Sequence, residues 1–241
     1  MKQSTSGDEN RMAGTTQVPA ERRRAGRPKG TVLQREKIAA AALELVGAHG
    51  YEALTMSAVA RELSVSPSAL YNHVESKQQL LQWIQELVMA RVESDAFHTL
   101  DIGAALRAWA TSYRNVFAAH SPLIPVIAIL PVAGSPNTLL MYEEVAAGMD
   151  RAGWPRADIV SSIVALESFI FGSALDATAP LDIFDPGPHS GSLPVFEDAL
   201  RLQRESGKSS ADDAFFIGLE ALVNGLISRL SPVGGLGSTH N

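Results

Sequence analysis

Residues 54–81 read LTMSAVARELSVSPSALYNHVESKQQLL and contain three successive helix starts. Thr55 is placed as an N-cap, because its hydroxyl can accept a backbone N–H of the turn that follows. Ser66-Pro67 restarts a helix, with serine as the cap and proline at the first position, where a missing N–H does no harm. Ser76 to Gln79 forms a capping box that opens a long helix. The stretch therefore predicts two short helices joined by a tight turn, and then a long third one.

The apolar residues of this stretch fall on one side of both short helices, 55–63 and 67–72. The residues expected to face inward are Val59, Ala60, Leu63, Val65 and Leu70. A pair of this kind fits DNA, because the second helix can enter a major groove about 12 Å wide while the first braces it. The residues left to contact DNA are Thr55, Ser66, Ser68, Ala69, Tyr71, Asn72, His73 and Lys77.

These side chains suit the chemistry of DNA in different ways. Serine can donate to a phosphate or a base, and the Ala69 methyl group can pack on a thymine methyl. Tyr71 and His73 can donate to phosphate oxygens, and Lys77 can form an anion site with the free N–H groups of its helix start. Structural roles stay open for Thr55 as a cap alone, Tyr71 as packing, His73 as a helix end and Lys77 as a solvated residue.

Upstream of this stretch the chain is basic. The segment from Arg22 to Lys37 holds seven basic residues and one acidic residue, although the whole chain has a formal net charge of −6. A basic N-terminal segment on an otherwise acidic chain indicates contact with a polyanion near the N-terminus. Within the sequence RAGRPKG we expect Arg27 and Lys29 to enter an A·T-rich minor groove. A solvated tail that binds phosphates diffusely is the alternative.

The remainder of the chain predicts an all-α fold with no alternating strand pattern. A first helix ends at Gly50, and later helices are expected at about 101–119, 122–132, 136–152, 156–178 and 210–230. Residues 179–209 are rich in proline and glycine and predict a long loop with a short helix at Val195–Arg204.

The stretch from Ile38 to Leu81 resembles the DNA-binding domain of the TetR family of transcriptional repressors, and LYNHVESK is close to its tetracycline-repressor branch. The resemblance implies an N-terminal three-helix helix-turn-helix domain in an all-helical dimer that releases DNA when a small molecule binds the C-terminal domain. It divides the chain into a flexible basic arm (1–30), a DNA-binding domain (31–80), a ligand-binding and dimerisation domain (81–232) and a loose tail (233–241).

The segment LRAWATSYR is similar to the helix that holds the drug in the tetracycline repressor. The resemblance places Trp109 and Tyr113 at ligand-contacting positions, and Phe117 follows at the same helical spacing. The magnesium-binding histidine of that repressor corresponds to Ile127, which cannot ligate a metal, so we expect an apolar ligand, no required metal and no cofactor. Other candidate ligand contacts are Phe171 and the acidic Glu143 and Asp176; Glu167 is a further acidic residue on an apolar helix. Ordinary core packing is the alternative for the aromatic residues, and solvent exposure for the acidic ones.

The apolar residues of helices 156–178 and 210–230 cover most of the circumference, which predicts burial on several sides. The resemblance implies that these two helices form the dimer interface, and an ordinary monomer core is the alternative. The expected partners are therefore a palindromic DNA operator, a small-molecule effector and a second copy of the chain. Two other regulatory interpretations stay open: an architectural DNA-binding protein without a ligand, and an activator.

Composition excludes several other classes. The chain has no cysteine, so it has no disulfide framework, Cys-ligated metal or thiol nucleophile. Its N-terminus has no apolar signal-peptide core, and its apolar run from Leu123 to Gly134 is short and contains two prolines. We therefore expect a cytoplasmic protein without a membrane partner. No GxSxG, HExxH or phosphate-loop motif is present, and an enzyme assembled from Glu143, Glu144 and His120 is the weaker alternative.

Overall fold

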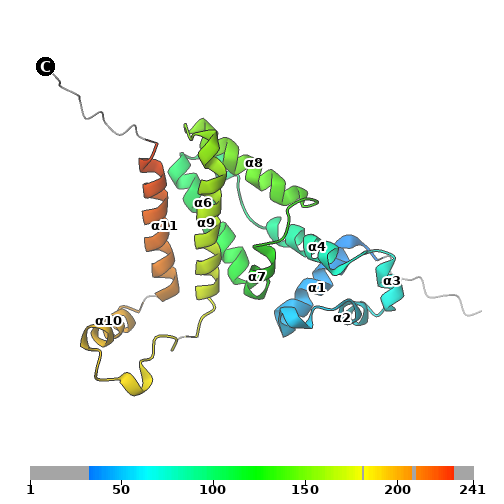
Figure 1. Cartoon of the computed structure of the whole chain (residues 1–241), viewed down its shortest axis with the longest axis horizontal. Coiled ribbons are helices and arrows are strands. Elements are labelled where there is room, and N and C mark those ends of the chain that lie inside the picture. Colours follow the sequence, from blue (N-terminus) through cyan, green and yellow to red (C-terminus); the bar gives the residue numbers. More distant parts are fainter. Residues whose placement is uncertain (1–32, 181, 208–209, 231–241) are drawn as a thin grey trace, which may run out of the picture. The chain divides into compact units, whose positions relative to one another are not determined.

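The computed structural model describes residues 33–180, 182–207 and 210–230, and within them the ordered elements are all helical (Figure 1). The elements are α1 (Arg35–His49), η1 (Tyr51–Ala53), α2 (Met56–Glu62), α3 (Pro67–Tyr71), α4 (Lys77–Met89), α5 (Ala96–Thr99), α6 (Ile102–Ala118), η2 (Ser121–Leu123), α7 (Ile124–Ile127), α8 (Pro136–Arg151), α9 (Arg156–Asp176), η3 (Gly187–His189), α10 (Pro194–Glu205) and α11 (Ser210–Ser228). The expected all-α fold is confirmed. The arm residues Arg27 and Lys29 and the tail 233–241 lie outside the described residues.

The three helix starts predicted from the sequence are confirmed by their capping hydrogen bonds. The Thr55 hydroxyl accepts from the Ala58 N–H at 3.1 Å, and the Ser66 hydroxyl accepts from the Ala69 N–H at 3.2 Å. The Ser76 hydroxyl accepts from the Gln79 N–H at 3.1 Å. The returning bond of the capping box is displaced by one residue, because the Gln79 amide oxygen accepts from the Glu75 N–H and not from that of Ser76.

The turn between α2 and α3 is closed by the hydrogen bonds of a Schellman motif. The Val65 N–H donates to the Ala60 carbonyl at 2.9 Å, and the Ser64 N–H donates to the Arg61 carbonyl at 3.0 Å. Ser64 takes a φ of +55°, the left-handed conformation that favours glycine. A serine at this position therefore carries backbone strain that sets the angle between the two short helices.

The helices α1 to α4 enclose one part of a continuous buried core. Ile38, Leu54 and Leu80 are fully buried there, together with Val59, Leu70 and Val74 under the two short helices. α1 packs along α4 and also contacts α2, and α2 contacts α3. The short α3 is thereby supported from beneath while its other side faces solvent.

The second group of helices is built around α6, which contacts α9 and α11 along its length and α5 and α8 at its edges (Figure 1). Trp109, Phe117 and Leu166 are fully buried in this group, as is Phe215. Among the described residues, α9 is the one helix that is long and apolar enough to cross a membrane by length and composition alone, and 33% of its most apolar window is buried. The sequence argument about apolar runs did not identify this segment.

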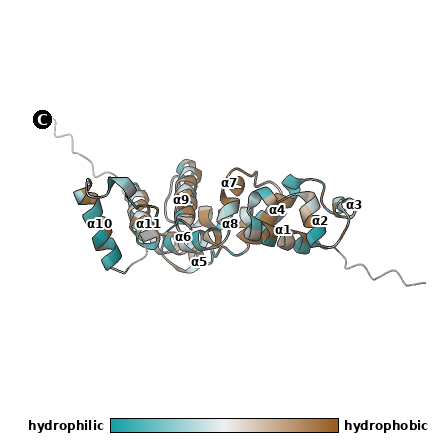
Figure 2. Ribbon diagram, turned by 90° about the horizontal axis from the view of Figure 1, so that it is seen from below, coloured by the Kyte–Doolittle hydropathy of each residue, from teal (hydrophilic) through white to brown (hydrophobic). Residues whose placement is uncertain are grey.

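Some expected elements differ from the observed ones. The helix predicted at 122–132 is wrong as a single element: η2 and the four-residue α7 take its place, and the helix stops at Ile127. Pro131 contributes to this early end, because it has no N–H to donate to the Ile127 carbonyl and disfavours a helical conformation at Leu130. The sequence did not predict the short elements η1 and α5. The helix proposed within the 179–209 loop is confirmed as α10, whose ribbon is largely hydrophilic (Figure 2).

Candidate DNA-binding surface and effector site

The side of α3 that faces away from the core carries most of the residues predicted to contact DNA. Leu70 and Val74 are fully buried and anchor this segment. Tyr71, which lies between them in the sequence, is 52% exposed. The other exposed members of the predicted set are Thr55, Ser66, Ser68, Asn72 and His73, whereas Ala69 and Lys77 are half-buried. The fold therefore brings the predicted contact residues onto one surface around α3.

The hydroxyl groups at the start of α3 are partly committed to the protein. Ser66 accepts from the Ala69 N–H, and its oxygen lies 3.0 Å from the Ser68 oxygen. Since a hydroxyl can donate one hydrogen bond and accept two, both serines retain capacity for an external partner. The Thr55 hydroxyl likewise caps α2 as an acceptor and keeps its proton for donation. The capping role and a phosphate contact are thus compatible at the same residue.

The ammonium group of Lys77 is positioned by an aromatic ring. Its Nζ lies 4.4 Å from the centroid of the Tyr51 ring, within the range of a cation–π contact. This contact joins the first turn of α4 to η1 and limits the freedom of a long side chain. A restricted lysine beside a helix N-terminus is well suited to hold an anion at a defined place.

The predicted effector residues on α6 form an aromatic cluster with α9. The Trp109, Tyr113 and Phe117 rings follow one another along α6, with centroid separations of 5.6 Å and 5.1 Å. Phe171 of α9 closes the cluster, at 5.5 Å from Tyr113 and 5.0 Å from Phe117. These distances are typical of edge-to-face aromatic packing. The structure therefore brings together four of the seven residues predicted from the sequence.

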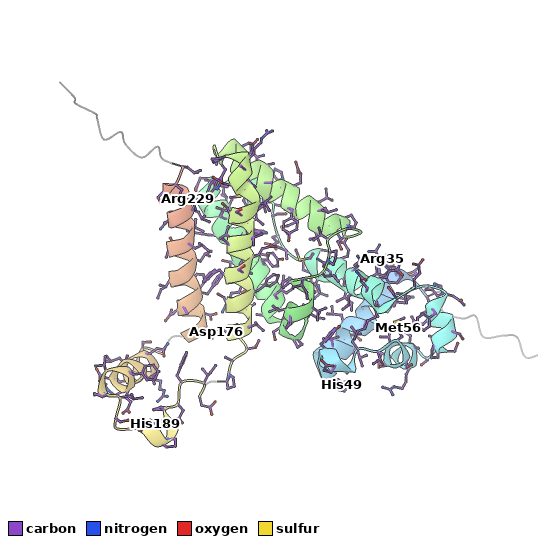
Figure 3. All side chains as sticks on the ribbon, in the orientation of Figure 1. Arg35, His49, Met56, Asp176, His189 and Arg229 are labelled. Carbon is purple, nitrogen blue, oxygen red and sulfur yellow. The ribbon has the colours of Figure 1, made fainter. Side chains whose placement is uncertain are left out.

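The other three predicted effector residues lie in different surroundings. Ile127 is buried, at 4% exposure, at the end of α7. Glu143 is exposed on α8, and Asp176 is the last residue of α9, where Figure 3 labels it. Neither acidic side chain makes a hydrogen bond or ion pair with the aromatic cluster within the described part of the chain. Their roles toward a ligand stay predictions.

The acidic residue that does join the cluster is Glu167 of α9. Its Oε1 accepts hydrogen bonds from the Tyr142 hydroxyl at 2.7 Å and from the Tyr113 hydroxyl at 3.1 Å. Burial raises the pKa of Glu167 above its usual range, although the two phenol hydrogen bonds oppose that shift. Burial and the neighbouring carboxylate likewise raise the pKa values of Tyr113 and Tyr142, so both phenols remain protonated donors.

The sequence pattern identified Glu167 as an acidic residue on an apolar helix, but it indicated no functional role for Tyr142. An aromatic residue near a charged one on different helices gives no periodic signal, so pattern analysis had no means of pairing them. In the structure, Tyr142 of α8 connects the α6–α9 cluster to a third helix, as does its neighbour Met141, whose Sδ accepts from the Trp109 Nε1–H at 3.2 Å.

A second polar junction joins α4 to the segment that begins α8. The Glu86 carboxylate accepts from the Asn137 N–H at 3.0 Å, and from the Thr138 N–H and hydroxyl at 3.3 Å each. Gln82 donates to the Ala133 carbonyl at 3.0 Å. A carboxylate at a helix N-terminus satisfies otherwise free N–H groups and interacts favourably with the helix dipole. α4 therefore supplies the N-terminal cap of α8.

α9 and α11 expose apolar side chains on faces that this chain does not cover. Val160 is 69% exposed and Ile217 is 72% exposed, and Val164 and Phe216 are also more than half exposed. Exposure of such aliphatic and aromatic side chains to water is unfavourable, and burying them in an interface would lower the free energy. Residues 156–178 and 210–230 were predicted to carry an interface, and their helices do present the apolar surface that one requires.

Comparison with known proteins supports both halves of this arrangement. The family model described as "Bacterial regulatory proteins, tetR family" matches residues 38–84, and the one described as "Tetracyclin repressor-like, C-terminal domain" matches residues 101–230. The chain is 27% identical to HTH-type transcriptional repressor DrrR1 of Streptomyces coeruleorubidus, over 85% of this chain and 81% of that protein. It is 28% identical to tetracycline repressor protein class D from Escherichia coli, over 84% and 95% of the two chains.

A solved structure shows the same fold. The TetR family protein ActR from Streptomyces coelicolor, determined in complex with (S)-DNPA, superposes with a TM-score of 0.69 at 25% identity. The similarity covers 83% of this chain and 99% of the ActR chain.

Proposed function

The chain belongs to the TetR family of bacterial regulatory proteins, and on that basis we propose that it is a ligand-responsive, sequence-specific transcriptional repressor. The observation that carries this proposal is the exposed polar face of α3, supported on buried Leu70 and Val74, in a chain whose relatives are repressors. The family and these relatives are regulators of transcription. We infer that the chain itself acts without catalysis and works in the cytoplasm.

The DNA contacts divide into two kinds. Tyr71, His73 and Lys77, with Thr55, contact phosphates, and these contacts position the protein on any duplex. Ser66, Ser68, Ala69 and Asn72 face the base edges of the major groove and carry sequence preference. Arg27 and Lys29 extend the contact into the minor groove beside each half-site.

The operator is a palindrome because the protein binds as a homodimer. The exposed apolar faces of α9 and α11, which include Val160 and Ile217, support pairing with the same helices of a second copy. A two-fold dimer places two copies of α3 about one helical turn of DNA apart, which requires two related half-sites at that spacing.

The effector binds at the aromatic cluster of α6 and α9, and α8 transmits its presence. Tyr142 donates to Glu167 in the cluster, and Thr138, one helical turn earlier on α8, is held by Glu86 of α4. α4 in turn packs along α1 in the DNA-binding half. A ligand that favours a different position of α8 therefore favours a different position of α4, and DNA affinity falls by the ligand's differential affinity for the two states.

The alternatives are less well supported by the arrangement of the side chains. The residues named for an enzyme do not assemble: Glu144 bonds to Ser94 and pairs with His98, whereas His120 contacts Arg91. An architectural DNA-binding protein would need no polar network inside its C-terminal half. Activation in place of repression depends on where the operator lies relative to the promoter.

The proposal is tested by selecting bound sequences from random duplex DNA at physiological salt with the full-length protein. We expect a palindromic motif of two half-sites, and we expect Asn72→Ala to change its sequence. Enrichment of A·T-rich DNA without a palindrome would refute specific repression and favour the architectural alternative. Deletion of residues 1–28 tests the arm separately, because its loss should weaken binding and reduce the salt dependence.

A further inference from the structure

Glu167 places a carboxyl group beside an aromatic cluster without a positively charged partner. Within the described residues, no lysine, arginine or histidine forms an ion pair with it. Both of its hydrogen bonds, from Tyr113 and Tyr142, reach the same oxygen, Oε1. The second oxygen, Oε2, accepts no hydrogen bond from the described residues, and it is not one of the buried polar atoms that lack a partner. Oε2 therefore has no hydrogen-bond donor in the described structure, and part of its surface is exposed to solvent.

A purely structural role does not explain why this residue is an acid. A glutamine oxygen could also accept both phenol hydrogen bonds, more weakly than a carboxylate, and would avoid the cost of placing a carboxylate among aromatic rings. The raised pKa of Glu167 shows that this cost is present. A retained charge in such a place is useful when something positively charged binds there.

The rings around Glu167 have the chemistry that recognises organic cations. Tyr142 and Phe171 are half-buried beside it, and Tyr113 and Phe117 form a buried floor behind them. Aromatic faces attract a cation through their quadrupole, and they also pack against the apolar body that carries it. A metal ion fits less well, because within the described part of the chain no group of three or more acidic or histidine side chains is arranged to ligate one.

We propose that the effector site binds an organic cation, with its charged nitrogen on Oε2 of Glu167 and its apolar body against Tyr113, Tyr142 and Phe171. This inference rests on the proposed function, because it names the class of molecule that acts at the effector site. The two phenols hold Oε1 and so orient Oε2 before the ligand arrives. The hydrogen bond from Tyr142 is one contact that links this site to α8, beside the one from Trp109 to Met141.

The experiment compares two probes of the same shape that differ in charge. Binding of 2-(1-naphthyl)ethylamine, a cation at neutral pH, and of 2-(1-naphthyl)ethanol, which is neutral, is measured by calorimetry with the full-length protein. Charge-assisted hydrogen bonds are stronger than neutral ones, so we expect the amine to bind about ten-fold or more tightly than the alcohol. Glu167→Gln should abolish that preference.

A matched control is Glu93→Gln, which removes the same charge from an exposed position outside the aromatic cluster. We expect this variant to keep the preference for the amine. Equal affinities for the two probes in the wild-type protein, no binding of the amine, or a preference that survives in Glu167→Gln would each overturn the proposal. The wild-type comparison needs no variant, so it stands even if Glu167→Gln were to fold poorly.

Binding to the selected DNA duplex is measured on the same preparations. If the proteins bind the palindrome but show no amine preference, the ligand class is wrong and the repressor function stands. If they show the amine preference but no sequence-specific DNA binding, the proposed function is wrong and the cation site stands.

Discussion

Removal of the Glu86 carboxylate should weaken the joint between α4 and α8. In Glu86→Ala, the Thr138 N–H and hydroxyl lose their acceptor, and both belong to a residue that is 1% exposed. The Asn137 N–H also loses its partner, but Asn137 is exposed and water can replace it. A buried group that loses its hydrogen-bond partner costs about 1–3 kcal/mol. The bonds to Thr138 are long, at 3.3 Å each, which places both losses at the lower end.

The same substitution removes a buried charge, since Glu86 is itself 7% exposed, and this gain offsets part of the loss. The helix-dipole contribution of a carboxylate at the start of α8 adds about 0.3–1 kcal/mol to the cost. We therefore expect Glu86→Ala to reduce the free energy of unfolding by about 2 kcal/mol. Glu86→Gln keeps one acceptor oxygen and should lose about half of that.

The assay is urea denaturation of the full-length protein at one fixed concentration, because the stability of a dimer depends on concentration. Glu143→Ala is the control, since it removes an exposed carboxylate from α8 that has no hydrogen bond in the described structure, and surface changes of this kind stay within about 0.5 kcal/mol. If Glu86→Ala cost no more than this control, the capping argument would be wrong. Glu86→Gln should also keep operator binding while reducing the loss of DNA affinity that an effector produces. An unchanged effector response would show that α8 does not act through this joint.

Three further predictions concern the turn, the DNA surface and the buried acid. Ser64→Gly should raise the free energy of unfolding by about 1 kcal/mol in thermal or urea denaturation, because glycine adopts the positive φ without strain; a loss of stability would contradict the strain assigned to this turn. Tyr71→Ala and Lys77→Ala should weaken binding to all duplexes alike, and Lys77→Ala should lower the slope of log affinity against log salt by about 1. Asn72→Ala should instead change the sequence preference found in the selection. If Asn72→Ala weakened binding uniformly and Tyr71→Ala or Lys77→Ala changed the sequence preference, the phosphate and base roles would be exchanged. Since the pKa of Glu167 is raised in the folded protein, its contribution to stability is present below the ordinary value of 4.5 and is lost as pH rises through the folded value. Glu167→Gln should therefore gain stability relative to the wild type as pH rises through that window, and a constant difference across the same pH range would show that the acid is not perturbed.

The sequence determined the DNA-binding half almost completely, and the reason is that its signals are local. The caps Thr55, Ser66 and Ser76 each act on a backbone N–H three residues later, so the bonds can be read from spacing alone. The inward and outward faces of α2 and α3 likewise follow from helical periodicity within a few residues. Resemblance to the family added the expectation of a dimer and an effector, and it placed Trp109 and Tyr113 at ligand-contacting positions; in the structure their rings pack together.

Element boundaries were less predictable where local signals compete. Proline at position 125 is compatible with the start of a helix, so the pattern favoured one helix through 122–132. The observed helix stops at Ile127, because Pro131 lacks the N–H that would bond to the Ile127 carbonyl and disfavours a helical conformation at Leu130. Likewise, nothing in the local pattern marked the turns of η1 and α5.

Only the tertiary structure decided which polar groups meet inside the molecule. The hydrogen bonds that Glu167 accepts join residues 54 and 25 positions apart in the sequence, and those that Glu86 accepts join residues 51 and 52 positions apart. Helical periodicity shows which face of a helix is buried, but not which neighbour the face will pack against. The cation site proposed at Oε2 and the joint between α4 and α8 both depend on that choice of neighbours. They follow from the packing of α6, α8 and α9 around a shared core, and no single segment of the sequence contains them.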